Sequence, residues 1–358
     1  MLFQVRDGTA DPSSTRREIE WSVLGSNHWH PLSAEKILLD TTNGFLVSGI
    51  VRILIPRTTT QLNTLLEPGF TWIRARVTSQ TQAVCRFLSV EPNAVPVTLV
   101  DATAATHLES GLPAKSIATS ALPLRGVKEI LQPYASFSGA APENESSFRK
   151  RISERLRHRN RASTAWDFEH LVLQKFPRIY KAQTLNHTDR FLNRNPGCVT
   201  LVLLPDARSS ESAISLTPQV DAATVAEIND YLATISSSFV TATAINPVFE
   251  PIHVSFKVAF RPGNPFASYR EILRQDIQAY LAPWAHTGGP PADFGGLLYR
   301  SAIIAFIDSL SYVDYITDFL LFHQAAGASS AAAVQIASAS KPGTLLTPTA
   351  PHLITSAT

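Results

Sequence analysis

The residues with the most evident chemistry form a basic run between positions 149 and 161. Seven of these thirteen residues are Lys or Arg, and Glu154 is the only acidic residue among them. Six of the seven are arginines, whose planar guanidinium makes paired hydrogen bonds to carboxylates and desolvates at lower cost than the lysine ammonium. The composition therefore favours contacts with a packed protein surface. The candidate contact residues are Arg149, Arg151, Arg155, Arg157, Arg159 and Arg161.

The same run permits a second interpretation, a nucleic-acid-binding module built on residues 149–161. Basic side chains that neutralise phosphates give binding that weakens steeply with salt. However, the net charge of the whole chain is only +2, so the basic charge is local. No aromatic residue stands between Arg149 and Arg161, although single-strand binders interleave aromatic residues with their charges. We rank protein contacts first and expect no nucleic acid among the partners.

A third interpretation is an enzyme that acts on a cell-surface polymer through paired carboxylates. Asp314 and Asp318 stand four apart in an expected strand and would share one face, where they could serve as acid and base. Such a pair is more often a solvated surface or part of a salt bridge. The sequence contains no G-x-S-x-G elbow and no zincin histidine pair. We expect no catalytic residues and no enzymatic activity.

Other short motifs give no support for a metal or a cofactor. His28 and His30 could present two imidazoles on one strand face, but no third ligand stands at a useful spacing. The stretch GGPPADFGG (288–296) lacks the Gly-Lys-Ser/Thr of a phosphate-binding loop. Cys85 and Cys198 match no zinc or redox spacing, which predicts two free thiols.

The bulk composition indicates a chain that can bury real cores. It has 358 residues, of which 44% are hydrophobic and 17% charged, enough for about two domains. The opening stretch MLFQVRDGTADPSS has no apolar run behind a basic start, and no segment approaches the roughly 18 apolar residues of a membrane helix. We expect a chain that is made in the cytoplasm, is soluble there and does not insert into a membrane.

The elements that must position these residues suggest four regions. Residues 1–125 read as a β-rich domain, with candidate strands in GFLVSGIVRILIP, FTWIRARVT, AVCRFLSV and VPVTLVDA. Serine, proline and glycine in 126–145 indicate a linker or arm. Residues 146–323 form an α+β domain. The Ala/Ser/Pro-rich tail, 324–358, is expected to be extended or poorly ordered.

Periodicity supports helices and strands in the third region. Phe148, Ile152 and Leu156 form one apolar stripe on a basic helix that should end near Asn160. Ser163 or Thr164 can cap the next helix, with Asp167 in the capping-box position after Thr164. The stretch IHVSFKVAF alternates as a strand, and SYREILRQDIQAYLAPW is an amphipathic helix. Because the elements interleave without a regular βαβ rhythm, we predict an α+β fold with an antiparallel sheet.

Several motifs together resemble the baseplate J-like family, the wedge proteins of contractile phage tails and extracellular contractile injection systems. The stretch ISERLRHRNRASTAWDFEHLVLQKFPRIYKAQTLNHT carries most of the resemblance. QPYASFSGAAPE resembles the family's linker, and YLAPW followed by FGGLLYRSAIIAFIDSLSYVDYITDF resembles its C-terminal helix, loop and strand. The resemblance extends over about residues 40–322. The matching positions are Ser153 to His158, Arg161, Ala162, Trp166 to Glu169, and Phe176 to Lys181.

The resemblance implies a structural role. A wedge subunit of this family joins neighbouring wedges around a central spike in a six-fold baseplate and couples the baseplate to the sheath. Its implied partners are other wedge subunits, sheath-adaptor proteins and spike or hub proteins, and its implied assembly site is the bacterial cytoplasm, in a particle that can be released outside the cell. The linker and the two following helices are similar to the inter-wedge association region, so the basic helix is expected to be a joint between subunits.

Overall fold

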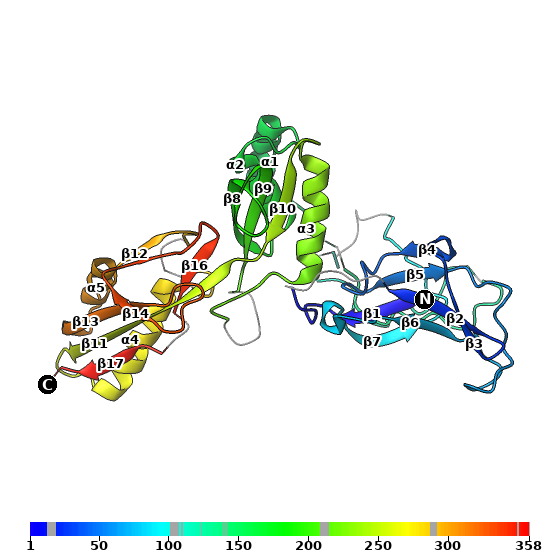
Figure 1. Ribbon diagram of the computed structural model, residues 1–358, viewed down its shortest axis with the longest axis horizontal. Helices are drawn as coiled ribbons and strands as arrows, with labels where there is room; N and C mark the ends of the chain where they lie inside the picture. The colour runs from blue at the N-terminus through cyan, green and yellow to red at the C-terminus, as the bar shows by residue number, and fades with distance from the viewer. Residues whose placement is uncertain are drawn as a thin grey trace. The chain divides into compact units, whose positions relative to one another are not determined.

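The computed structural model describes the chain except residues 13–18, 101–106, 109, 123, 138, 140–141, 208–214, 287–291, 349–350 and 358 (Figure 1). The excluded positions include parts of the expected linker and of the glycine-rich loop, so the interpretation of those parts lies outside the described residues. The chain divides into two compact units. One consists of Met1–Pro92 and Asn160–Thr358, and the other of Asn93–Arg159. The fold class is α+β, as predicted.

Two antiparallel sheets form the N-terminal part of the first unit. They are β4-β5-β1-β7, built from β1 (Leu2–Arg6), β4 (Ile37–Asp40), β5 (Gly49–Ile53) and β7 (Arg86–Glu91), and β3-β2-β6, built from β2 (Glu20–Gly25), β3 (His28–Pro31) and β6 (Ile73–Arg76). Phe3 and Val51 of the first sheet pack with Trp21 of the second and with Phe45 in one core. The ring centroids of Phe3 and Phe45 lie 5.1 Å apart. This aromatic cluster holds the two sheets together.

A three-stranded sheet with two helices forms the middle part of the first unit. It contains α2 (Ala165–Lys175), β8 (Ile179–Thr188), β9 (Arg194–Pro205), α3 (Ala222–Ile235) and β10 (Thr241–Ile245). The strand order is β10-β9-β8, with β8 antiparallel and β10 parallel to β9. Both helices pack into one core with this sheet, where Val172, Leu203, Ile228 and Leu232 are fully buried. The amphipathic pattern of these helices thus buries one face of the sheet.

A capping box starts α2, as the sequence predicted. The Thr164 side chain accepts a hydrogen bond from the Asp167 N–H, and Asp167 Oδ2 accepts one from the Thr164 N–H at 2.8 Å. We expect Thr164→Ala to lower the free energy of unfolding by about 1 kcal/mol, because it leaves an N–H of the first turn without a partner. Urea unfolding followed by circular dichroism measures the loss. Thr164→Ser keeps the hydroxyl and is the control, and an equal loss in both variants would contradict the capping explanation.

The C-terminal part of the first unit is built around one long strand (Figure 1). On one side β11 (Val248–Phe260) pairs antiparallel with β13 (Val313–His323), which in turn pairs with β14 (Ala332–Val334). On its other side β11 pairs in parallel with β16 (Thr344–Thr347) and then β17 (Leu353–Ser356). Two helices and a two-stranded ribbon complete this part: α4 (Phe266–Leu281), α5 (Arg300–Asp308), β12 (Leu297–Tyr299) and β15 (Ile336–Ser338).

The core of this part confirms the alternation that predicted β11. Ile252, Val254, Phe256 and Val258 are buried beside side chains of α4 and α5. The intervening residues face away, as expected for a strand with one buried face. Among the described residues, no helix is both long and apolar enough to cross a membrane.

Two expectations about elements are wrong. The candidate strand VPVTLVDA forms no strand over residues 95–100, its described portion, and Val100 is 99% exposed. The tail after residue 324 was expected to be an extended or poorly ordered arm, but its described residues contain four short strands. Of these, β14, β16 and β17 join the sheet of β11 and β13, and β15 pairs with β12. Its Leu345 and Ile354 are buried, so non-local packing orders a segment whose composition predicted little structure.

His352 anchors the last strand beside β11 and should make this region acid-sensitive. Its Nδ1 accepts a hydrogen bond from the Val254 N–H at 3.3 Å. Burial, together with the charges of His253 and Arg274, lowers the pKa of His352 from 6.5 to about 4. Because the unfolded chain binds this proton at higher pH than the folded chain, folded-state stability falls as the pH drops from 6.5 to about 4.

His352→Asn keeps a hydrogen-bond acceptor but does not titrate, so we expect it to remove this part of the pH dependence. Hydrogen exchange of the β11 and β17 amides, measured above and below the interval, gives the readout. An unchanged pH dependence in the variant would show that another group is responsible.

In the second unit, the described residues form one helix, α1 (Glu145–His158). Much of the remaining chain in this unit is irregular, held locally by hydrogen bonds between two segments. The Lys115 N–H donates to the Gln132 carbonyl at 3.0 Å, and the Ser136 N–H donates to the Leu112 carbonyl at 2.8 Å. These contacts order the backbone without placing large side chains in a shared core.

Candidate protein interface

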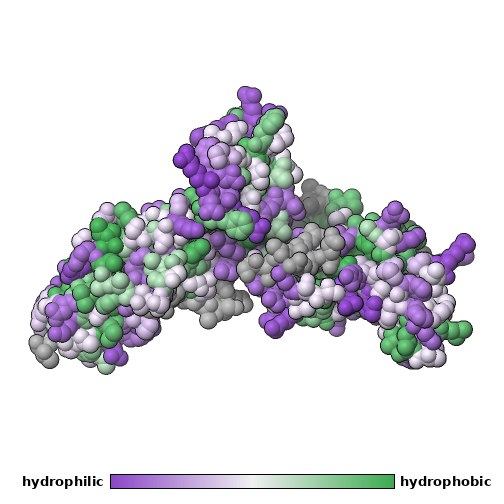
Figure 2. Space-filling model, in the orientation of Figure 1, coloured by the Kyte–Doolittle hydropathy of each residue, from purple (hydrophilic) through white to green (hydrophobic). Residues whose placement is uncertain are grey.

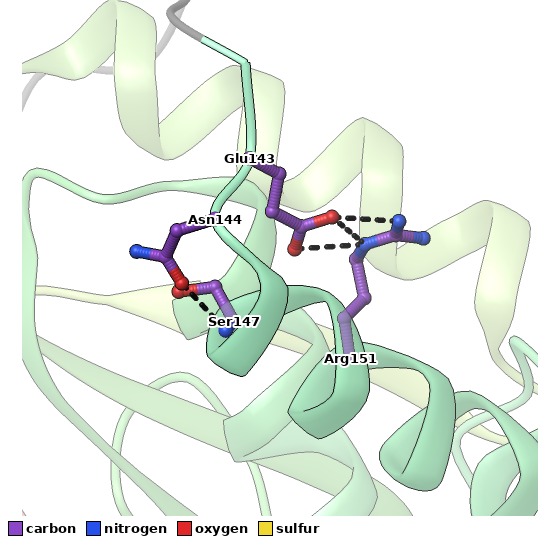
Figure 3. Close-up of polar contacts among 4 residues, drawn as sticks. All are labelled: Glu143, Asn144, Ser147 and Arg151. Atoms are coloured by element: carbon purple, nitrogen blue, oxygen red, sulfur yellow. Dashed lines mark hydrogen bonds and ion pairs between the residues drawn. The ribbon is translucent and has the colours of Figure 1, made fainter.

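Helix α1 begins and ends through its own sequence signals. The Asn144 side chain caps the N-terminus by accepting a hydrogen bond from the Ser147 N–H at 2.8 Å (Figure 3). Glu145 lies in the first turn, and Arg155, Arg157 and His158 lie in the last, which complements the helix dipole. The helix ends at His158, and its C-cap residue Arg159 has a left-handed backbone. The predicted helix is confirmed, with its end two residues before Asn160.

Two of the six candidate arginines are paired with carboxylates of their own chain. Arg151 makes a bidentate ion pair with Glu143, in which Nη2 lies 2.7 Å and Nε 3.0 Å from Oε2 (Figure 3). The hydrogen bond from Arg151 lowers the pKa of Glu143. Arg149 pairs with Glu145, one helical turn earlier, and both side chains are largely exposed. Glu143 was not recognised from the sequence, and its signal is its place just before the helix.

The remaining candidate arginines occupy different positions. Arg155 and Arg157 are exposed on the last turns of α1, and Arg157 has a partner within the chain. Arg159 forms the C-cap, and Arg161 is exposed in the segment before α2. Within the described part of the chain, no ion pair is recorded for Arg155, Arg159 or Arg161 at 4 Å or less. Their guanidinium groups are thus available to carboxylates of another molecule.

The apolar stripe of α1 is not covered in the chain by itself. Phe148 is 45% exposed, Ile152 38% and Leu156 73%. One turn separates each residue from the next, so all three lie along one side of the helix. Arg155 lies on the border of this side, and the Arg151 guanidinium lies 5.3 Å from the Phe148 ring centroid. The helix therefore presents an apolar strip bordered by guanidinium groups.

The rest of this unit also leaves its apolar side chains exposed. Among its described residues, none of the apolar side chains is buried, and the one buried residue is His158. Several large apolar residues are more than half exposed: Val95, Val97, Leu99, Val100, Leu122, Leu124, Leu131, Phe137 and Leu156. A segment that buries so little apolar surface does not offset the entropy of ordering its backbone, and exposed apolar area of this kind marks protein contacts.

The two aspartates of the enzyme hypothesis lie at irregular points of β13. The pairing with β11 shifts by one residue at Asp314 and again at Asp318, so each is the extra residue of a β-bulge. The regular alternation on which the hypothesis rested is therefore interrupted, although both side chains line a shallow groove beside α5. Asp318 pairs with Lys257 at 2.8 Å, as expected of a surface ion pair.

The histidines of the metal hypothesis lie on the β2–β3 hairpin. His28 Nδ1 is 3.1 Å from the Ser26 carbonyl, and His30 Nε2 is 3.2 Å from the Gly25 carbonyl. Within the described residues, no group of three His, Cys, Asp or Glu side chains is placed to hold a metal ion. Cys85 is buried and Cys198 half-buried, and both are free thiols.

Comparison with known proteins identifies a family and structures with a similar fold. A family model described as "Baseplate protein PVC11-like" matches residues 12–341. The chain is also similar to a chain in the cryo-EM structure of the anti-feeding prophage baseplate, six-fold symmetrised, with a TM-score of 0.47 and 15% identity. That alignment covers 95% of this chain and 77% of the other. A search of curated proteins finds no match.

Proposed function

Because the chain belongs to the PVC11-like family of baseplate proteins, we propose that it is a structural subunit of the baseplate of a contractile injection system. Within the baseplate it acts as a wedge protein of the baseplate J-like kind. It joins neighbouring wedges around the central spike and couples the baseplate to the sheath. Its partners are other wedge subunits, sheath-adaptor proteins and spike or hub proteins of a six-fold assembly.

One observation carries the contact part of this proposal. The unit Asn93–Arg159 combines an arginine-bordered apolar strip on α1 with an absence of buried apolar side chains among its described residues. Surface of that kind is stabilised when another protein covers it, because burial removes the apolar area from water and guanidinium groups bind carboxylates bidentately. In this proposal residues 126–145 are the linker that precedes α1.

The role is mechanical, without bond-making chemistry. Domains connected by exposed segments can move relative to each other, since interfaces between domains are commonly small and polar. Such movement accompanies the change of state of the baseplate, and contraction of the sheath follows. The particle assembles in the bacterial cytoplasm and can act outside the cell.

Purification of the chain together with the products of its neighbouring genes tests the proposal. We expect a complex that contains this chain, and we expect electron microscopy to show six-fold rings. The same preparation without this chain is the control and should give no rings. Rings that form normally without it, or a chain that purifies free of all neighbouring products, would contradict a wedge role.

A further inference from the structure

A groove separate from the arginine helix lies between α5 and the edge of β13. Arg300, Ile304 and Asp308 line it from the helix, and the continuous stretch Asp314–Phe319 lines it from the strand. Its volume is about 400 Å³. Figure 2 shows small apolar areas separated by polar ones over the block that contains β11, β13 and α5. The groove is thus a mixed surface with one helical wall and one strand wall.

The strand wall of the groove has an open side. On one side β13 pairs with β11 along most of its length, but on the other side β14 pairs only with Leu321–His323. Among the described residues, no strand pairs with Asp314–Leu320 on the side away from β11. Alternate N–H and C=O groups of an edge strand point away from its neighbour. An extended segment could therefore add to β13 here.

The helical wall repeats at the spacing of an extended chain. Arg300, Ile304 and Asp308 are four residues apart, so they recur about every 6 Å along the helix axis. Alternate residues of a strand recur about every 6.6 Å and lie on one face. Three alternate side chains of an added strand would thus each meet one of the three helical residues. The side chains of the added strand would then be charged, apolar and charged in turn, to match Arg300, Ile304 and Asp308.

The charges at the two ends of the groove are opposite. The Arg300 guanidinium lies at the N-terminus of α5, 6.0 Å from the Phe319 ring centroid, and its Nη1 donates to Gln335 Oε1 at 3.1 Å. Asp308 lies at the other end of α5, and Asp314 lies near the start of β13. Within the described residues, no ion pair is recorded for Arg300, Asp308 or Asp314.

Two β-bulges limit the length of regular strand that a partner can use. They place Asp314 and Asp318 on either side of Tyr315–Thr317, which pairs regularly with β11. Bulges at an edge also discourage unspecific pairing with other chains. A partner must therefore fit a short segment, and its side chains must supply much of the selectivity.

We propose that this groove binds an extended segment of a partner protein as an added antiparallel strand, with an acidic, an apolar and a basic side chain at alternate positions. The antiparallel direction places the acidic residue beside Arg300, the apolar residue beside Ile304 and the basic residue beside Asp308. This contact is independent of the arginine helix and of the wedge assignment.

A synthetic peptide tests the proposal on the whole chain. The probe is the capped, fluorescein-labelled peptide Thr-Glu-Thr-Val-Thr-Lys-Thr, with binding followed by fluorescence anisotropy up to about 1 mM peptide, near the weak end of measurable affinity. The reversed peptide Thr-Lys-Thr-Val-Thr-Glu-Thr presents the same side chains for a parallel strand. We expect saturable binding of the first peptide and weaker binding of the second.

Two further arms separate strand addition from simple charge attraction. Of two peptides that are N-methylated at one or the other alternate set of amides, only the one whose methyl groups face β13 should lose binding. Asp308→Lys, an exposed position, should weaken the first peptide about two- to fivefold, as for a surface ion pair. A peptide with glutamate in place of its lysine should bind this variant as tightly as the first peptide binds the unchanged chain.

The outcomes are distinct. Binding with the expected direction, methylation pattern and charge swap supports the groove as a strand acceptor. Absence of binding, preference for the reversed peptide, or indifference to N-methylation overturns it. Circular dichroism of Asp308→Lys establishes that the variant is folded. None of these results depends on whether the chain enters a baseplate.

Discussion

Replacing Glu250 by alanine is expected to lower the free energy of unfolding of the C-terminal sheet by about 3–5 kcal/mol, because it leaves several hydrogen-bond donors at a buried site without their acceptor. The Glu250 carboxylate is fully buried on β11. It accepts hydrogen bonds from His323 Nε2 at 2.7 Å, from the Ala326 N–H at 3.2 Å and from the Ser340 N–H at 3.3 Å. Those donors come from the end of β13, the following turn and the segment before β16, so one side chain connects three parts of the sheet.

Two variants define the interpretation of this loss. Glu250→Gln keeps the shape and an acceptor oxygen, so we expect a loss of about 2 kcal/mol, near the value of a hydrogen bond to a charged group. Glu271→Ala removes an exposed carboxylate that pairs with Arg274 on α4 and should have little effect on stability. Hydrogen exchange of the β11, β16 and β17 amides reports the local stability. Equal effects of Glu250→Ala and Glu271→Ala would refute a central role of the buried carboxylate.

Acid should weaken the same sheet through Glu250. Burial acts to raise the pKa of Glu250, but hydrogen bonds from Ser340, His323 and Ala326 outweigh burial and hold the pKa below its ordinary value of 4.5. Since the folded-state pKa is depressed, the stabilisation is fully present above pH 4.5 and is lost as the pH falls through the folded-state pKa. Glu250→Gln should remove this acid-dependent part of the amide-exchange profile.

The second large effect is expected at the arginine helix. Charge reversal in the double variant Arg155→Glu/Arg157→Glu should weaken joining to partner subunits by about a hundredfold or more, because it places carboxylates where a partner's carboxylates would lie. Both side chains are exposed in the chain, so the isolated fold should be retained. Co-purification with the neighbouring gene products measures joining, and circular dichroism of the isolated chain measures folding.

Lys150→Glu is the matched control for this experiment. Lys150 is exposed on the same helix and, like Arg157, lies on the side away from the apolar strip. It stands two turns before Arg157, so it tests a charge change on that side without altering the last turns of α1. It changes the net charge of α1 in the same sense and should leave joining nearly unchanged. Normal assembly of the double variant would refute the joint, and an equal defect in the control would indicate a general charge effect. Binding of duplex DNA at low salt that the double variant abolishes would favour the nucleic-acid alternative.

Local patterns gave the helices and the central strand. The four-residue spacing of Phe148, Ile152 and Leu156 predicted α1, and the Thr164 and Asp167 pair predicted the start of α2, as the structure confirms. Alternation over IHVSFKVAF predicted the buried face of β11. These signals are reliable because the periods of a helix and of a strand are properties of the backbone over a few residues.

Signals that depend on distant partners were not available from the sequence. The sequence placed Asp314 and Asp318 on one face, whereas pairing with β11 makes each the extra residue of a bulge. VPVTLVDA alternates like a strand, but its described part pairs with no other strand. The role of Glu250 was not visible at all, because its donors are 73, 76 and 90 residues away.

The sequence by itself determined that this protein carries a concentrated arginine helix with one apolar strip, because charge and periodicity are written in consecutive residues. The tertiary structure decided that Arg149 and Arg151 are paired within the chain, and that the apolar strip is exposed. It also decided that the tail closes the C-terminal sheet in parallel with β11. Each of those outcomes depends on contacts between residues that are distant in the sequence. The free energy of burial and of strand pairing comes from those contacts and not from local propensity.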